Sequence, residues 1–305
     1  MSLIVKDLTK HFGQKTAVDG LNFELTQAGV YGLIGTNGAG KTTTIRMILD
    51  MLPIDGGTAL WNGKTVKKSG LRFGYMPEER GIYTKTKVLE QLVYFGKLRG
   101  MEKQQAIDAA KRWIERLGVT EYANMTAEKL SKGNQQKIQL ISTLIHDPEL
   151  IFLDEPFSGL DPLNAQMFHE LINSMAQAGK YIIMSSHQMS TVEQYCSEIT
   201  LLHRGKALVQ GDLKQIKQSY GHTKLLLGAN EEAYAMAEAT GLHLIEKLPG
   251  ECVFGLPEQD ADAVCETLLR DLLAKNIMPE KFVLSEPTLH EIFIDKVGQV
   301  EGGNA

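Results

Sequence analysis

The chain has 305 residues, of which 43% are hydrophobic and 23% are charged, as in ordinary globular proteins. Its net charge is −5 and no run of Lys or Arg exceeds two residues, so a nucleic-acid partner is not expected. No apolar stretch approaches the roughly 20 residues that a membrane-spanning helix needs, and the N-terminus has no signal-peptide core. We therefore expect any membrane-spanning part of a complex to belong to another chain.

Cysteine usage indicates the redox compartment. Cys196, Cys252 and Cys265 are odd in number and share no metal-ligand spacing. We expect them to be buried thiols in a reducing cytoplasm.

The first two thirds of the chain predict an α/β fold. Residues 1–30 alternate apolar and polar side chains, which predicts an antiparallel sheet, and residues 58–66 suggest a hairpin. Residues 87–146 are helical in pattern, and strands that alternate with helices on either side predict an α/β sheet with an all-helical insertion. Strands are expected at 30–34, 73–76, 150–153, 180–184 and 198–202, with a helix at 165–178.

The remainder predicts a second, smaller α+β domain. A weakly patterned stretch at 212–222 separates a first domain, 1–217, from a second, 222–297, and the Gly-rich residues 298–305 are expected to be a disordered tail. The order β-α-β-β-α-β is the ferredoxin-like arrangement. The expected elements are a strand at 224–227, a helix at 231–239, strands at 242–246 and 252–256, a helix at 260–273, a strand at 281–284 and a helix at 288–297.

A phosphate-binding loop follows the strand at 30–34. Residues 35–43 fit G-x-x-x-x-G-K-[ST] between a strand and a helix, a context that a merely structural Gly-rich turn does not require. Glycines let backbone amides face the phosphates, Lys41 can reach the β- and γ-phosphates, and the Thr42 hydroxyl suits Mg²⁺. The segment predicts nucleoside triphosphate binding by Gly35, Thr36, Asn37, Gly38, Ala39, Gly40, Lys41, Thr42 and Thr43.

An acidic strand end supplies the second nucleotide element. The apolar residues 150–153 are followed by Asp154 and Glu155, which a parallel sheet delivers to its carboxyl edge. Asp154 is expected to hold Mg²⁺ and Glu155 to polarise the attacking water. Taken alone, the same residues also fit a buried strand with a solvated acidic turn.

A capped helix lies between these two elements. Ser131 is a good N-cap for the periodic residues 132–145, and the first turn presents amides and small polar side chains, which suits an anion. An ordinary capped helix is the alternative for this segment.

The order of these segments resembles that of ABC-type ATPases over about residues 1–215. Residues 130–134 resemble the LSGGQ signature, 157–161 the D-loop, and 185–187 the switch histidine. The resemblance implies ATP as the nucleotide and makes Asp161 a nucleotide-binding residue. It also implies that His187 contacts the γ-phosphate, although an isolated histidine is more often structural. Phe12 matches the aromatic residue that stacks on adenine.

The family mechanism requires two ATPase subunits. By resemblance, Ser131, Gly133 and Asn134 of a second subunit, either another copy or a homologue, cap the far side of the γ-phosphate. ATP is then buried between two domains that close on binding and open after hydrolysis.

Several positions depart from the family pattern. Thr36 replaces a usual Pro, Lys132 a Gly and Asn134 a Gln. Glu78 stands where the family has a Gln that touches Mg²⁺ or the lytic water. Its carboxylate can approach Mg²⁺, or it can simply be solvated.

The loop at 77–81, the signature at 130–134 and the segment 285–293 resemble ATPases of bacterial ABC-2-type exporters. This resemblance implies a cytoplasmic ATP-hydrolysing subunit, peripheral on the membrane, that powers separately encoded permease subunits. Dimer contact or regulation is implied for the C-terminal domain. A non-transport ABC ATPase acting on a soluble complex is the alternative, and a scaffold without hydrolysis is disfavoured by Glu155.

Overall fold

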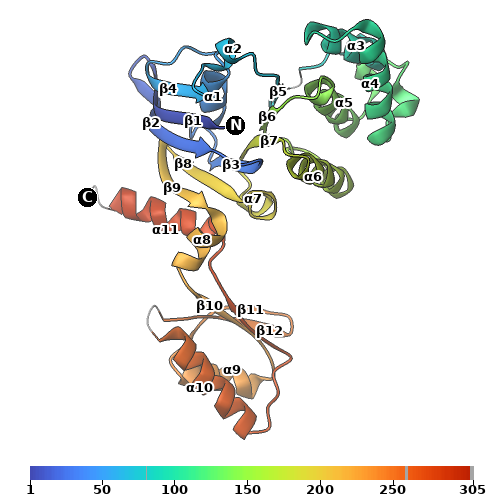
Figure 1. Ribbon diagram of the computed structural model, residues 1–305. Helices are drawn as coiled ribbons and strands as arrows, with labels where there is room; N and C mark the ends of the chain where they lie inside the picture. Colours follow the sequence, from blue (N-terminus) through green and yellow to red (C-terminus); the bar gives the residue numbers. More distant parts are fainter. Residues whose placement is uncertain (80, 258–259, 303–305) are drawn as a thin grey trace. The chain divides into compact units, whose positions relative to one another are not determined.

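The computed structural model describes residues 1–79, 81–257 and 260–302, and the chain divides into two compact units (Figure 1). The first unit is Met1–Gly211 and the second begins at Asp212. Helix α8 (Leu213–Ser219) lies in the second unit, so the first ends a few residues before the expected residue 217. Strand β9 (Lys206–Asp212) is the last strand of the main sheet, which sets this limit.

A small antiparallel sheet opens the first unit, with strands in the order β2-β1-β4. The alternation over residues 1–30 therefore predicted its first two strands correctly. The hairpin expected at 58–66 forms only as a tight turn, in which Trp61 and Lys64 make a single antiparallel bridge. A second strand does not follow, because the chain enters α2 (Val66–Ser69), and the buried Trp61 also pairs with Leu3. The strands are β1 (Leu3–Phe12), β2 (Lys15–Leu25) and β4 (Gly56–Trp61).

The main sheet of the first unit has six strands in the order β5-β6-β7-β3-β8-β9. Neighbouring strands from β5 to β8 are parallel, and β6 and β7 are buried at every position, as expected for strands covered on both faces. The strand that leads into the phosphate loop, β3, is therefore central. The strands are β3 (Gly29–Gly35), β5 (Phe73–Met76), β6 (Leu150–Asp154), β7 (Tyr181–Ser186) and β8 (Glu198–His203).

Helices cover both faces of this sheet. Helix α1 (Lys41–Ile48) shares an apolar core with the antiparallel sheet and with one face of β3, β6 and β7. The opposite face contacts α6 (Pro162–Gln177) and α7 (Met189–Tyr195). The close approach of α7 explains Gly32, where an added Cβ would lie 3.0 Å from Val192.

The helical insertion comprises α3 (Val88–Leu98), α4 (Lys103–Arg116) and α5 (Lys132–Leu144), which contact one another (green in Figure 1). Short 3-10 turns at Thr120–Tyr122 and Ala127–Lys129 connect α4 to α5. After the insertion the chain continues into β6. In sequence, α5 therefore follows strands β3 and β5 of the main sheet and precedes the other four.

The second unit has a four-stranded antiparallel sheet in the order β11-β12-β10-β13, which is the strand order of the ferredoxin-like arrangement. Its apolar core lies between this sheet and two helices. The elements are β10 (Lys224–Gly228), α9 (Glu231–Ala239), β11 (His243–Leu248), β12 (Glu251–Gly255), α10 (Ala261–Ala274), β13 (Lys281–Ser285) and α11 (Leu289–Gly302).

The expected disordered tail is partly wrong, since α11 continues from residue 298 to Gly302. The amide of Gln299 donates to Asp295 one turn earlier, a side-chain pair that supports helix here. The rest of the expected tail, 303–305, lies outside the described residues.

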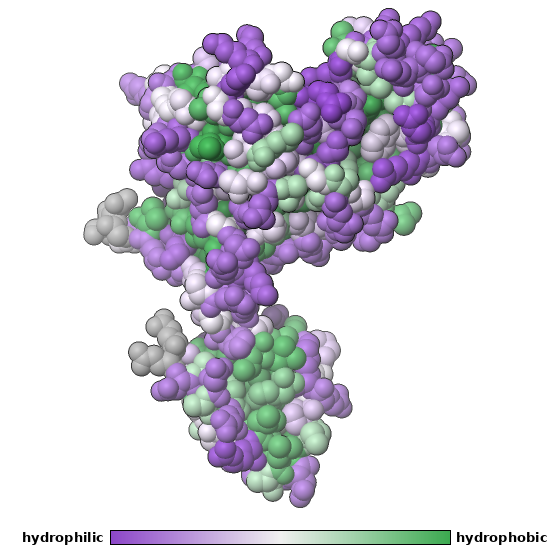
Figure 2. Space-filling view, in the orientation of Figure 1, coloured by the Kyte–Doolittle hydropathy of each residue, from purple (hydrophilic) through white to green (hydrophobic). Residues whose placement is uncertain are grey.

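The exposed apolar residues, the three cysteines and the helix lengths can be compared with what the composition predicts. Apolar side chains gather on the visible face of the second unit (Figure 2). The exposed large apolar residues of this unit include Leu244, Ile245 and Val283. All three cysteines are buried free thiols, and burial raises the pKa of Cys196. Within the described ranges, we find no helix that is both long and apolar enough to cross a bilayer.

Candidate nucleotide-binding site

The phosphate loop is packed so tightly that glycine is required at both of its ends. A Cβ on Gly35 would lie 2.3 Å from the Leu202 carbonyl oxygen, and one on Gly40 would lie 2.5 Å from that of Ala17. Gly40 is also in the left-handed region, with φ 107°, immediately before α1 begins at Lys41. The loop therefore leads directly into a helix N-terminus, where backbone amides favour an anion.

A cavity of about 440 Å³ lies over this loop. Glu155 and Glu78 reach it from other segments, and Phe12, whose side chain is half exposed, lies on it as an aromatic wall. Three sequence-predicted groups therefore converge on one cavity. Its lining residues are Phe12, Lys15, Ala17, Asn37, Gly38, Ala39, Gly40, Lys41, Thr42, Thr43, Glu78 and Glu155.

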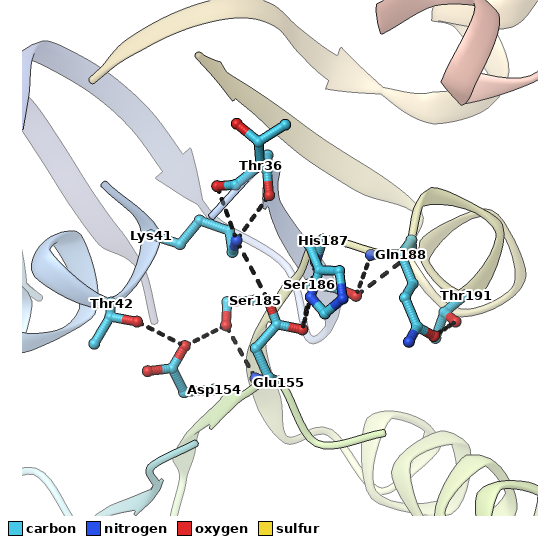
Figure 3. A network of polar contacts seen from close by, with 11 residues as sticks. Thr36, Lys41, Thr42, Asp154, Glu155, Ser185, Ser186, His187, Gln188 and Thr191 are labelled. Atoms are coloured by element: carbon cyan, nitrogen blue, oxygen red, sulfur yellow. Dashed lines mark hydrogen bonds and ion pairs between the residues drawn. The ribbon is translucent and has the colours of Figure 1, made fainter. Parts of the chain in front are cut away.

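Lys41 is a buried cation that folds back over its own loop. Its Nζ donates to the carbonyl oxygens of Gly35 at 2.7 Å and Thr36 at 3.4 Å. It also lies 3.3 Å from Oε1 of Glu155, and both side chains are more than nine-tenths buried (Figure 3). Since buried charges persist when they are paired, this ion pair holds both groups ready at the cavity.

Asp154 connects the phosphate loop to the end of β6. Its Oδ1 accepts hydrogen bonds from the Thr42 hydroxyl at 3.2 Å and from Ser185 on β7 (Figure 3). Its Oδ2 is buried and has no hydrogen-bond partner. A buried, unpaired carboxylate oxygen beside a threonine hydroxyl is the donor set that Mg²⁺ prefers, so these residues fit the ion.

Glu155 lies at the first position beyond β6, in a strained backbone conformation with φ 52°. Its own amide is held by Ser185, through the hydroxyl at 3.1 Å and the carbonyl at 3.2 Å. Its Oε2 lies 2.9 Å from Nδ1 of His187 and accepts from the His187 amide at 3.4 Å. The carboxylate is thus fixed between a lysine and a histidine.

Glu78 lies at the junction of two cavities. It lines the cavity over the phosphate loop and a second one of about 480 Å³, and Glu155 lines both as well. Two acidic side chains from separate segments therefore line both cavities. Arg80, in the same loop, lies outside the described residues.

The signature residues do not line the phosphate-loop cavity of their own chain. Ser131 caps α5 by accepting from the Asn134 amide at 3.3 Å. Asp161 caps α6 through the amide and side chain of Asn164, and these hydrogen bonds hold the pKa of Asp161 below its ordinary value. Gly133 approaches that cap closely, because a Cβ there would lie 2.9 Å from the Asn164 side chain. Signature and D-loop therefore form one exposed polar edge.

Sequence reasoning missed three residues of this site. Ser185, which the sequence analysis quoted only within the segment 185–187, contacts both acids, and the available signal was the pair of serines at the end of an apolar strand. Gln136 donates to the Pro156 carbonyl at 2.6 Å, and Gln139 donates to two carbonyls of the loop that holds Glu78. Nothing in the local sequence reveals these last two contacts, because their partners lie at least 20 residues away in the chain.

The central strand, the phosphate loop at a helix N-terminus and the buried acidic strand end together define the class of P-loop nucleotide-binding ATPases. The family described as "ABC transporter" matches residues 18–158, and the "ATP-binding protein DrrA1-3-like, C-terminal domain" matches residues 211–297.

Individual proteins resemble the chain over most of its length. The "Uncharacterized ABC transporter ATP-binding protein YhaQ" of Bacillus subtilis is 42% identical, with 98% of this chain and 99% of that protein covered. The "Linearmycin resistance ATP-binding protein LnrL" of the same organism is 29% identical, with 97% and 98% covered. A solved structure described as "Structure of ATP binding subunit of ABC transporter" has a TM-score of 0.67 and 28% identity, covering 72% of this chain and 94% of that one. The chain therefore belongs to the ATP-binding proteins of ABC transporters and is an ATPase.

Proposed function

We propose that this ATPase powers a membrane exporter, with closure of two subunits on ATP and reopening after hydrolysis. The observation that carries the proposal is the position of Glu155, buried between Lys41 and His187 at the edge of the nucleotide cavity. A carboxylate fixed there can orient a water molecule toward the γ-phosphate.

Lys41 is the group that responds first to nucleotide. Its ammonium now satisfies two loop carbonyls and Glu155, and a triphosphate in the cavity offers it more negative charge at the same place. Transfer of Lys41 to the β- and γ-phosphates frees one oxygen of Glu155 to accept a hydrogen bond from water. Nucleotide binding and base activation are coupled in this way.

Thr42 and Asp154 are the proposed holders of Mg²⁺, with Glu78 close by. When bound, the ion neutralises charge on the phosphate oxygens and orients them. Ser185 keeps Asp154 in place from β7, and His187, at the end of the same strand, orients Glu155 and lies on the γ-phosphate side.

A second subunit is proposed to complete the site. Ser131 and Asp161 are exposed and Gly133 and Asn134 are partly exposed, and none of the four lines the phosphate-loop cavity of its own chain. They are therefore available to the nucleotide of a partner. The partner is a second copy or a homologous ATPase. Loss of the γ-phosphate removes the contact between the two halves and lets them separate.

The proposed membrane partners are separately encoded permease subunits, which place this chain on the cytoplasmic face of the membrane. An exposed cluster of large apolar side chains supports a protein partner there, with Tyr83 from the segment before α3 and Tyr94 and Leu98 from α3 each about half exposed or more. Tyr83 stacks on Phe95 with ring centroids 5.6 Å apart, which gives the cluster a defined shape. The resistance function printed for LnrL supports export of a drug-like substrate.

The test is Glu155→Gln, which removes the charge that polarises water and keeps the size of the side chain. Turnover should fall by at least about 100-fold while ATP still binds and drives dimerisation, since only a transition-state interaction is lost. Ser197→Ala, outside the cavity, serves as the matched control. Phosphate release near the wild-type rate would remove Glu155 as the base.

The same variant tests the partner. Tagged E155Q protein with ATP and Mg²⁺ is used to capture partners from solubilised membranes, which are identified by mass spectrometry. A polytopic membrane protein in roughly equal amount is expected. Capture of soluble proteins alone would favour the non-transport ATPases instead.

A further inference from the structure

The outer edge of the parallel sheet is closed by side chains. Strand β5 is the edge strand, so its alternate carbonyls at Phe73 and Tyr75 point away from β6 and have no strand partner. Helix α5 lies against this edge. An added Cβ on Gly74 would lie 2.6 Å from the Thr143 carbonyl oxygen, which shows how closely the two backbones approach.

Two side chains of α5, Gln139 and Thr143, and His146 in the turn that follows the helix face the carbonyls along this edge. His146 Nε2 lies 2.9 Å from the Phe73 carbonyl oxygen. The Thr143 hydroxyl lies 3.3 Å from the Tyr75 carbonyl oxygen and shares its single proton with the Gln139 carbonyl of its own helix, at 3.0 Å. Gln139 continues the series at 2.7 Å from the carbonyl oxygen of Pro77. Gln139 and Thr143 are four residues apart and so share one face of α5, and His146 continues this row from the turn after the helix.

Gln139 extends the series beyond the end of the strand. Its amide also donates to the Glu79 carbonyl at 3.1 Å, so the same side chain binds the backbone on both sides of Glu78. Only 3% of Gln139 is exposed, which protects these hydrogen bonds from exchange with water. One turn earlier, Gln136 holds the Pro156 carbonyl, next to Glu155.

We infer that Gln139 is a positioning residue that makes the Glu78 loop move together with α5. Helix α5, which is capped by the signature residue Ser131, then moves as one rigid body with the loop that carries Glu78. When the nucleotide bound to the partner subunit contacts Ser131 of this chain, Glu78 moves into place in the cavity of this chain at the same time. This inference rests on the proposed function. It gives a route by which binding at the nucleotide site of the partner subunit adjusts the position of Glu78 in the nucleotide site of this chain.

The test compares Gln139→Leu with Gln135→Leu. Gln135 is a buried glutamine on the same helix whose amide donates to the Ala127 and Leu130 carbonyls, both inside the helical insertion. Hydrogen exchange of peptides spanning 73–79 and 131–145 is measured in the full-length protein with and without a non-hydrolysable ATP analogue and Mg²⁺. In the wild type and in Q135L, the analogue should protect both peptides together. In Q139L it should protect 131–145 and leave 73–79 exchanging at least about tenfold faster.

A double-mutant cycle with Glu78→Gln gives an independent readout. Q139L should lower turnover about tenfold in the wild-type background but less than about twofold in E78Q, because its effect passes through Glu78. Q135L and E78Q should combine additively. Gln139→Asn, which keeps the amide on a shorter side chain, replaces Q139L should that variant fail to fold.

Joint protection of both peptides in Q139L, together with additive effects in the cycle, would overturn the inference. If E78Q alone leaves turnover and Mg²⁺ dependence unchanged, the role proposed for Glu78 fails. The exchange measurement then decides the coupling by itself.

Discussion

Every Asp, Glu, His, Lys, Gln, Ser or Thr that is fully buried in the described part of the chain lies in the first unit, between Lys10 and Thr200. The core of the second unit consists of Leu, Ala, Cys and Phe side chains, and its ion pairs, such as Lys281 with Glu251, lie on the surface. The first unit therefore holds costly buried charges, among them Lys41, Asp154 and Glu155 at the phosphate loop. The described part of the second unit follows the ordinary rule of an apolar interior.

The largest expected effect comes from breaking the buried pair of the first unit. Lys41→Ala should lower the rate of ATP hydrolysis at least about 100-fold. It should also lower the free energy of unfolding of the first unit by about 3 kcal/mol, because Glu155 loses a buried partner. Phosphate release and urea unfolding followed by tryptophan fluorescence measure the two effects. Lys180→Ala, which breaks an exposed pair with Asp147 in the same unit, should change neither appreciably.

An apolar substitution in the second unit should separate the two regions. Leu268 is fully buried in its core, and Leu268→Ala should cost about 3 kcal/mol of the stability of that unit. Both tryptophans, Trp61 and Trp113, lie in the first unit, so their fluorescence reports only on it. We expect circular dichroism to show the destabilisation while the tryptophan transition and the ATP affinity stay unchanged. A common shift of both transitions would mean that the units unfold as one.

Mild acid should lower the stability of the first unit, by less than the two substitutions above. Burial lowers the pKa of His146, and the nearby Arg99 and Arg72 add to this, against the opposing hydrogen bond to Phe73. The unfolded state therefore takes up a proton below the ordinary value of 6.5 that the folded state refuses, so the first unit loses stability as the pH falls through that value. Tryptophan-monitored unfolding at pH 7.5 and about pH 5.5 measures this, and His146→Asn should flatten the difference. An equal pH response in H146N would assign the effect to other groups.

The sequence predicts the chemistry of this fold better than its long-range packing. Lys41, Thr42, Asp154 and Glu155 lie together as the sequence predicts, because each belongs to a short pattern whose geometry is local. The hairpin expected at 58–66 is reduced to the turn between Trp61 and Lys64, because the chain enters α2 directly after it. The strand partner of β4 is β1, which the local pattern does not reveal.

The same limit explains what was missed around the site. The amide of Gln139 meets carbonyls 60 and 62 residues away, and a glutamine within a helical pattern carries no sign of such a partner. The roles of Phe12, Ser131 and His187 came from resemblance, since each residue alone fits an ordinary structural position. The structure separates these three residues by position. Phe12 lines the phosphate-loop cavity and His187 contacts Glu155, whereas Ser131 does not line the cavity of its own chain.

The side-chain donors along the edge of β5 also bear on how the protein avoids aggregation. An unpaired edge strand is a template on which other chains can add strands, and natural proteins cover such edges. Here the cover is α5, and the segment beneath it, Phe73–Met76, is uncharged and includes two aromatic residues. Variants or conditions that detach α5 from β5 would therefore expose an aggregation-prone edge strand. We expect such variants to lose solubility before they lose folded structure.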